Sequence, residues 1–279
     1  MSKNDFNYQI SNDLPPANLD TQFLFDSDYC ETPGLSALSL FFQKTQSLIS
    51  LAKPEMSDPL PNLLVLGYVS AVESYLREII RKLVIIDIPS QKKCEDKSIT
   101  YGAATAYSDE MLPDALLENY SFAGKKNIVS SLTNFLGITM QQSADPDLDN
   151  ILENFSKVCQ VRHCLVHRFG QFGSINAIEL GLRQHEEFLG KPIRLNFQTL
   201  QVIFVICSNT VKMLNNFLFR EILSRTVKES CCNWSWDFET DRETFEKYFA
   251  VFSSDESQAS IKDAYEAFKK AYAGSKWSR

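Results

Sequence analysis

The sequence contains little glycine and very little histidine. Only 10 of its 279 residues are glycine and only 3 are histidine. Turn-rich all-β folds usually need more glycine, so the composition favours a helical protein. Two of the three histidines, His163 and His167, lie in one short segment. Because imidazole titrates near neutral pH, that segment is the first candidate for chemistry.

The seven cysteines follow no regular spacing and include no Cys-x-x-Cys pair. An odd number without such a pattern indicates a reducing compartment rather than a disulfide framework. The first ten residues also lack the apolar core of a signal peptide. Together these features predict a cytoplasmic protein.

We find no long uncharged apolar run of the kind that crosses a membrane. The best candidate, Val202–Cys207, is far too short and is soon followed by Lys212. We therefore predict no membrane partner. A glycine-rich phosphate loop and a Gly-x-Ser-x-Gly elbow are also missing, which argues against an NTPase and a serine hydrolase.

Charge restricts the classes of partner. The net charge is −7 and the isoelectric point is about 5.1. These values exclude a uniformly basic surface for nucleic acid. They allow a local basic groove, because net charge averages over the whole surface. Any contact with RNA is therefore expected inside a cleft and should depend strongly on salt.

The chain divides into three parts by composition. Hydrophobic residues make up 44% of the sequence, which is enough for a substantial core. Residues 1–34 are polar and rich in Asn and Asp, which predicts an N-terminal arm. We predict an all-α antiparallel helical bundle over residues 35–227 and a C-terminal helical appendage over residues 228–279.

Apolar spacing and capping residues predict the individual helices. Asp145 and Pro146, for example, suit the cap and first turn of a helix that ends near Phe169. Residues 89–108 resemble a loop, and Ile175–Leu180 with Pro192–Asn196 could form a short β-hairpin. Helices are expected over residues 35–51, 60–86, 109–119, 125–135, 145–169, 197–227, 242–252 and 258–272.

The helix expected to end near Phe169 carries an arginine in an unusual position. On a helical wheel, Arg162 falls in the middle of the apolar face, at nearly the same angle as Phe155. A guanidinium there needs an anion as a partner. His163 and His167, four residues apart, share the shoulder of the same face.

Two structural explanations compete with a catalytic one. Arg162 could pair with a buried carboxylate such as Glu73 and serve the architecture. Alternatively, Cys159, His163 and His167 line up three types of ligand that zinc accepts. A fourth ligand would then have to come from elsewhere, and no His-Glu-x-x-His motif is present. We expect neither a metal nor another cofactor.

The catalytic hypothesis assigns complementary roles to Arg162 and His167. Cleavage of a phosphodiester without a metal needs a general acid or base with a pKa near neutrality, and imidazole provides one. It also needs a group that stabilises charge on the phosphoryl oxygens, for which a bidentate guanidinium is suited. His163 could position His167 or contact RNA, and Arg168 could contact an RNA phosphate.

The segment Arg162-His163-Cys164-Leu165-Val166-His167 resembles the Arg-x(4–6)-His motif of the HEPN superfamily. His163 stands where the family often has a polar residue. The earlier segment that contains Glu73 is similar to a bundle helix in which an acidic residue can support the motif. The resemblance covers roughly Leu35 to Val227.

This resemblance implies a fold and an activity. Active members are metal-independent endoribonucleases of all-α fold, whose products carry a 2′,3′-cyclic phosphate and a 5′-hydroxyl. They usually form homodimers in which two motifs face one cleft. Many bacterial members are toxins or antiphage-defence effectors with an antitoxin or sensor partner. Some continue the motif as His-x-Tyr, whereas this chain has Phe169, which offers no hydroxyl for modification.

Two functions without catalysis remain open. Many HEPN-type bundles serve as dimerisation or ligand-sensing modules, and the same residues would then bind a nucleotide phosphate or support the fold. A helical scaffold without any ligand is the third hypothesis. It predicts no accessible cleft at Arg162.

Overall fold

The computed structural model describes residues 10–11, 14–28, 34–140, 145–254 and 260–274. The chain divides into two units, Met1–Pro33 and Gly34–Arg279. In the first unit, Asp20 caps a short 3-10 helix, η1 (Thr21–Leu24), by accepting a hydrogen bond from the Gln22 amide at 3.1 Å. All of its described side chains are exposed, so they contribute nothing to a core.

The second unit is built from helices. Twelve α-helices and no β-strand lie among the described residues, which confirms the all-α class. Four long helices are α1 (Ala37–Leu51), α2 (Leu60–Ile86), α7 (Pro146–Arg168) and α10 (Phe197–Lys228), and α11 (Phe238–Phe252) equals α1 in length but begins four residues before its predicted start. For the first four helices, sequence and structure can be compared directly. Their bounds agree with the predicted ones within two residues, and α7 has the predicted cap, since Asp145 accepts from the Leu148 amide.

The shorter helices include two that the sequence analysis missed. Residues 89–108, predicted as a loop, contain α3 (Ile88–Cys94) and α4 (Tyr101–Ala106). The side chains of Asp87 and Thr100 cap these helices, and such local capping stabilises even a short helix. The remaining ones are α5 (Leu112–Leu117), α6 (Lys125–Ser131) with the π-helical turn η2 (Leu132–Leu136), α9 (Leu182–His185) with the 3-10 turn η3 (Glu186–Phe188), α11 (Phe238–Phe252) and α12 (Ile261–Tyr272).

The predicted β-hairpin was wrong at its first strand. Ile175–Leu180 belongs to α8 (Ser174–Leu180), which turns Asn176 and Ala177 into the protein and ends at Gly181 with φ of 102°. Residues 192–196 form no strand, and Pro192 makes only an isolated antiparallel bridge with Gln171. A proline has no amide hydrogen to donate, so it limits such a ladder.

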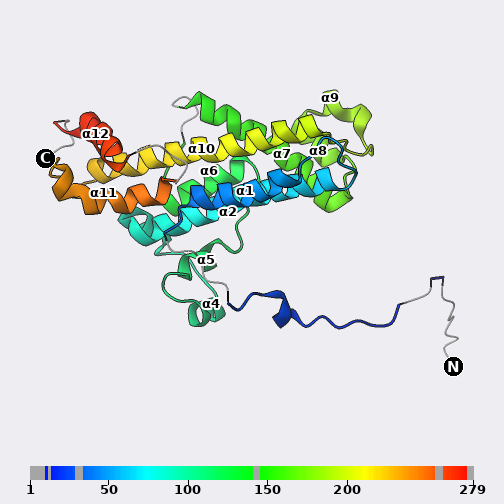
Figure 1. The fold of residues 1–279 in the computed structure, drawn as a ribbon, viewed down its shortest axis with the longest axis horizontal. Helices are drawn as coiled ribbons and strands as arrows, with labels where there is room; N and C mark the ends of the chain where they lie inside the picture. The colour runs from blue at the N-terminus through cyan, green and yellow to red at the C-terminus, as the bar shows by residue number, and fades with distance from the viewer. Residues whose placement is uncertain (1–9, 12–13, 29–33, 141–144, 255–259, 275–279) are drawn as a thin grey trace. The chain divides into compact units, whose positions relative to one another are not determined.

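Contacts between the long helices fix their directions. Lys44 donates to Ser74 Oγ at 2.6 Å and Lys82 to the Leu35 carbonyl, so α1 and α2 run antiparallel. Tyr68 packs on Phe204 at 5.5 Å between ring centroids, and Tyr75 donates to Asn215 Oδ1 at 3.2 Å, so α2 and α10 run in the same direction. Figure 1 shows α1, α2 and α10 along one another. Neighbouring helices are therefore not all antiparallel, which departs from the predicted antiparallel bundle.

Helix α7 runs antiparallel to α10. Arg220, in the second half of α10, pairs with Asp145 at the start of α7 at 3.0 Å. Burial raises the pKa of the Cys207 thiol, and Cys159 on α7 lies close enough to raise it further. Since both helices rise about 1.5 Å per residue, the Val202–Val205 turn of α10 lies level with about residues 160–163 of α7.

The C-terminal helices pack onto the second half of α10. Phe219 contacts three rings of α11 at centroid distances of 5.4 to 6.4 Å, and Asn215 donates to the Phe252 carbonyl at 3.0 Å. Asp241 then joins α11 to α12, because it accepts a hydrogen bond of 2.6 Å from Tyr265. The predicted start of α12 at Gln258 lies outside the described residues. The proposed domain boundary at residue 228 stays a prediction.

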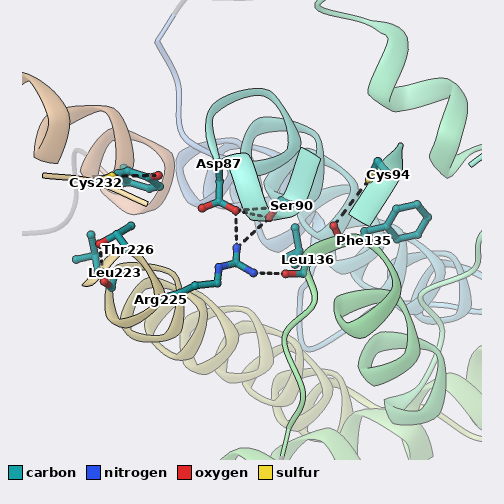
Figure 2. Close-up of polar contacts among 10 residues, drawn as sticks. Asp87, Ser90, Cys94, Phe135, Leu136, Leu223, Arg225, Thr226 and Cys232 are labelled. Carbon is teal, nitrogen blue, oxygen red and sulfur yellow. Dashed lines mark hydrogen bonds and ion pairs between the residues drawn. The ribbon is translucent and has the colours of Figure 1, made fainter. Parts of the chain in front are cut away.

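A buried ionic network closes this end of the protein (Figure 2). Arg225 of α10 donates to Asp87, to Ser90 Oγ at 3.0 Å and to the Leu136 carbonyl, and Asp87 is completely buried. The network joins the α2–α3 junction, the end of η2 and α10. It lay outside the candidate residues from sequence, because its two charges are 138 positions apart.

One helix in the described part of the chain, α10, is long and apolar enough to span a bilayer by length and composition. The expectation that no such run exists therefore overlooked α10. Half of its most apolar 18-residue window is buried inside the protein. Core helices that pack on both sides pass the same test, so location and membrane contact stay predictions.

Candidate functional site

The candidate motif occupies the last two turns of α7. The helix ends where Phe169 adopts a left-handed conformation with φ of 51° and Gly170 one with φ of 87°. The Gly170 amide then donates to the Cys164 carbonyl at 3.0 Å, a common closure of helix C-termini. His167 and Arg168 thereby lie in the final turn, where the helix dipole favours positive side chains.

The two histidines of the motif lie against each other. Their ring centroids are 4.6 Å apart with an interplanar angle of 47°. The side chain of His163 is half-buried, whereas that of His167 is exposed. The four-residue spacing thus produces an imidazole pair with one ring held in the protein and the other open to a ligand.

Asn176 of α8 orients the inner histidine. Its side chain is 1% exposed, and its Nδ2 donates to Gln160 Oε1 at 2.9 Å and to the Gln160 carbonyl at 3.3 Å. The same Nδ2 lies 3.2 Å from His163 Nδ1. A backbone carbonyl can only accept, so Nδ2 acts as a donor here, with two hydrogens for three acceptors. A hydrogen bond to His163 Nδ1 requires that ring to carry its proton on Nε2 in the neutral form.

Asn176 was not predicted as a site residue, because residues 175–180 were expected to form a strand. The only local signal is a single Asn flanked by Ile175 and Ala177, shortly after Gly173. In a helix, that spacing turns Asn176 and Ala177 inward. The partners of Asn176 on α7 are 13 and 16 residues earlier, beyond the reach of a local pattern.

Arg162 lacks the carboxylate partner that the sequence suggested. The side chain is half-buried, and within the described part of the chain it makes no hydrogen bond or ion pair. Glu73 lies near the same thiol as Arg162, that of Cys159. Its Oε1, however, accepts from the Phe122 amide at 3.2 Å. The hypothesis that Glu73 holds Arg162 directly is therefore not supported by a contact.

Arg168 lies across the turn that follows α7. Its Cδ and Nη1 are 3.0 and 3.1 Å from the place where a Cβ of residue 173 would stand. A side chain at position 173 would require Arg168 to shift by a few tenths of an ångström. The side chain of Arg168 is exposed, and it has no ion pair with any described residue. Its charge is available to an anion.

The Cys159, His163 and His167 spacing does not assemble a metal centre. Among the described residues, no group of three or more His, Cys, Asp and Glu side chains is placed to hold a metal ion. Cys159 is buried, and burial raises the pKa of its thiol to about 12, with Glu73 adding to the effect. A thiolate is the form that binds metal, so this environment disfavours it as a ligand.

Several exposed apolar side chains lie on α7 and on the helices that pack against it. Phe169, directly after the motif, is 95% exposed. Others lie on α8, which packs on α7, and on the Val202–Val205 turn of α10, which is level with about residues 160–163 of α7. Single exposed apolar residues are ordinary, but several large ones near one site indicate an interaction surface. These residues are Val166, Phe169, Ile175, Ile178, Val202 and Val205.

A cavity of about 620 Å³ lies between α6, α7 and α8, and its wall on α7 ends one helical turn before the inner histidine. Its wall on α7 includes Gln160, the residue that holds Asn176. The motif therefore adjoins a space large enough for a small ligand.

No known protein family, no curated protein and no solved structure matches this chain.

Proposed function

We propose that this protein is a metal-independent endoribonuclease of the HEPN type. Its RNA products would carry a 2′,3′-cyclic phosphate and a 5′-hydroxyl. The observation that supports this most strongly is the half-buried Arg162, which has no anion among the described residues and lies within two turns of an open imidazole pair. An unpaired guanidinium on the same two turns of helix as two histidines suits a phosphodiester ligand.

The reaction needs one proton removed and one supplied. A base takes the proton of the 2′-hydroxyl, the 2′-oxygen bonds to phosphorus, and the 5′-oxygen leaves and receives a proton. The exposed His167 is the residue for one of these transfers. Arg162 would stabilise the charge on the non-bridging oxygens, and His163 would donate a hydrogen bond from Nε2.

One chain supplies only part of this arrangement. Five helical positions separate Arg162 from His167, which turns them about 140° apart around α7. In a homodimer, His167 of a second copy would lie opposite Arg162 of the first and provide the complementary acid or base. The exposed apolar residues around the motif, Phe169 foremost, are suited to such a homodimer.

The biological role that we propose is that of a cytoplasmic toxin or antiphage-defence effector. An antitoxin or sensor protein would then restrain it. Since Phe169 stands where some relatives carry a modifiable tyrosine, restraint would come from bound protein rather than from modification there. The target RNA would be recognised through the cleft, because the chain as a whole is acidic.

A non-catalytic dimerisation or ligand-sensing module is the second candidate. The apolar surface around the motif favours it, since that surface serves an interface whether or not RNA is cleaved. In this case Arg162 would bind a nucleotide phosphate without turnover. Glu73 accepts a hydrogen bond from the Phe122 amide and makes no hydrogen bond or ion pair with Arg162, and this arrangement is compatible with either function.

Cleavage of total RNA in excess EDTA separates the two candidates. We expect cuts with 2′,3′-cyclic phosphate ends from the purified protein and none from His167→Ala. His185→Ala is the matched control, because His185 lies on α9 and its contacts are with the Gly181 carbonyl, Phe172 and Phe188 and with none of the motif residues. Folded protein that makes no cuts would support the binding module, and equal cutting by both variants would contradict the assignment of His167.

A further inference from the structure

A polar stripe on α7 joins the cavity to the histidines. The stripe follows the spacing i, i+4, i+7, i+10 and i+14, which keeps its members on one side of a helix. Its first three residues line the cavity, and the last two form the imidazole pair. The five residues are Glu153, Lys157, Gln160, His163 and His167.

Asn176 contacts both parts of the stripe. It bonds Gln160, which is part of the cavity wall, and contacts His163 one turn further along α7. Its own Oδ1 is buried and has no hydrogen-bond partner among the described residues. With a rise of about 1.5 Å per residue, His163 lies roughly 4.5 Å along the axis from Gln160 and His167 about 10 Å from it.

Two lysines of the cavity are available to an anion. Lys125 is already held by Asp149 at 2.6 Å and by Glu153 at 2.7 Å. Lys126 on α6 is exposed and has no ion pair within the described residues, and Lys157 bonds only the neutral Asn154 at 3.3 Å. These two ammonium groups come from different helices and line the same space.

Two acidic residues line the cavity as well, and one of them, Glu153, is paired with Lys125. Glu179 of α8 lines the cavity and has no positive partner in the described part of the chain. Its carboxylate would weaken the binding of phosphate without preventing it. The cavity thus contains opposing charges whose removal should change anion affinity in opposite directions.

We propose that the cavity binds the single-stranded RNA segment next to the scissile phosphate, with Lys126 and Lys157 on its phosphates. The inference rests on the proposed nuclease function and names where the substrate lies. A strand in the cavity continues along the stripe to His163 and His167, which places a neighbouring phosphodiester at the imidazole pair. The net charge of −7 disfavours RNA binding to the chain as a whole, so a site with free lysines is needed.

Binding of a fluorescein-labelled ten-nucleotide RNA tests this directly. The His167→Ala chain is used so that the probe stays intact, and anisotropy is measured from low to high KCl. We expect Lys126→Gln with Lys157→Gln to weaken binding about tenfold and to reduce the salt slope by about 1.4, since each phosphate contact to a single strand contributes about 0.7. Glu179→Gln should tighten binding.

The matched control is Lys92→Gln with Lys270→Gln. Both lysines are exposed and lie outside the cavity, so the net charge changes equally. We expect less than about a twofold effect from this pair. Equal weakening by both pairs would overturn the proposal, because it would reflect overall charge alone.

Cleavage assays separate this inference from the nuclease function. In the chain with His167 intact, the cavity pair should slow cleavage of dilute RNA about as much as it weakens binding. Unchanged cleavage would overturn the cavity proposal and leave the nuclease standing. Absence of both RNA binding and cleavage would overturn both. Binding of AMP or pyrophosphate without RNA would overturn the RNA site in favour of a free-nucleotide site.

Discussion

Two half-buried arginines, Arg162 and Arg225, lie near opposite ends of the packed long helices. They differ in how many partners each one has. Arg225, near the end of α10, donates to a buried carboxylate, a hydroxyl and a backbone carbonyl (Figure 2). Arg162, near the end of α7, has neither a hydrogen bond nor an ion pair with any described residue. The two ends are therefore built for different purposes.

The surroundings follow the same division. The Arg225 end is covered by α11, whose Phe252 packs on Phe219 and receives a hydrogen bond from Asn215. The Arg162 end leaves Phe169 and its apolar neighbours exposed. A buried charge that has its partners supports the architecture, whereas a half-buried charge without them requires a ligand or a second chain.

Removing Arg225 should give the largest effect on stability. Arg225→Met leaves the Asp87 carboxylate buried without its cation, which should lower the free energy of unfolding by about 3–5 kcal/mol. Urea unfolding measures this change. The control is Arg220→Met, whose ion pair with Asp145 is 61% exposed on the arginine side and should contribute less than about 1 kcal/mol. Similar losses in both variants would contradict the contrast.

Removing Arg162 should affect cleavage and spare the fold. Arg162→Ala takes away no internal partner, so the free energy of unfolding should change by less than about 1 kcal/mol. Cleavage should fall about 10²–10³-fold if the guanidinium stabilises the phosphoryl charge. Both quantities are measured on one preparation. A variant that unfolds as readily as Arg225→Met would make Arg162 structural.

Acid should lower the stability of the protein through Asp241, a buried carboxylate that joins α11 to α12. Burial alone would raise the pKa of Asp241, but hydrogen bonds from Tyr265, Ser235 and the Trp236 amide together lower it below its usual value. A lowered pKa adds stability above the unfolded pKa, and this stability is lost as the pH falls through the folded value. Below about pH 4, unfolding should therefore become easier.

Thermal melts between pH 7 and pH 3 test this expectation. Asp241→Asn should lower the melting temperature at pH 7 and flatten its dependence on pH below 4, because the titrating group is gone. Asp263→Asn, at an exposed position of α12, serves as the control and should keep the wild-type profile. An unchanged slope in Asp241→Asn would show that other carboxylates determine acid sensitivity.

The smallest expected effect concerns Asn176. Asn176→Ala removes the donor to His163 Nδ1, so the ring should change from the Nε2–H tautomer to a mixture. Nitrogen-15 shifts of the imidazole report this, with His185 as an internal reference. Cleavage should fall less than about tenfold, since one neutral hydrogen bond contributes about 1 kcal/mol. Unchanged nitrogen shifts would refute the orienting role.

Local chemistry predicted most of the long helices. The apolar stripe of α2 gave its bounds at residues 60–86, and Asp145 with Pro146 gave the start of α7, because periodicity and capping depend on residues within a few positions. Local patterns predicted the short segments less well. The same local patterns did not reveal α3 and α4, and a run of mixed residues at 175–180 did not distinguish a strand from α8.

The amino-acid sequence alone determined the helical class, the ends of α1, α2, α7 and α10 within two residues, and the grouping of Arg162, His163 and His167 on α7. Tertiary structure decided which side chains meet. It paired Glu73 with the Phe122 amide instead of Arg162, brought Asn176 to His163, and joined Asp87 to Arg225 across 138 positions. Helix formation depends on near neighbours, whereas these pairings depend on how whole helices pack.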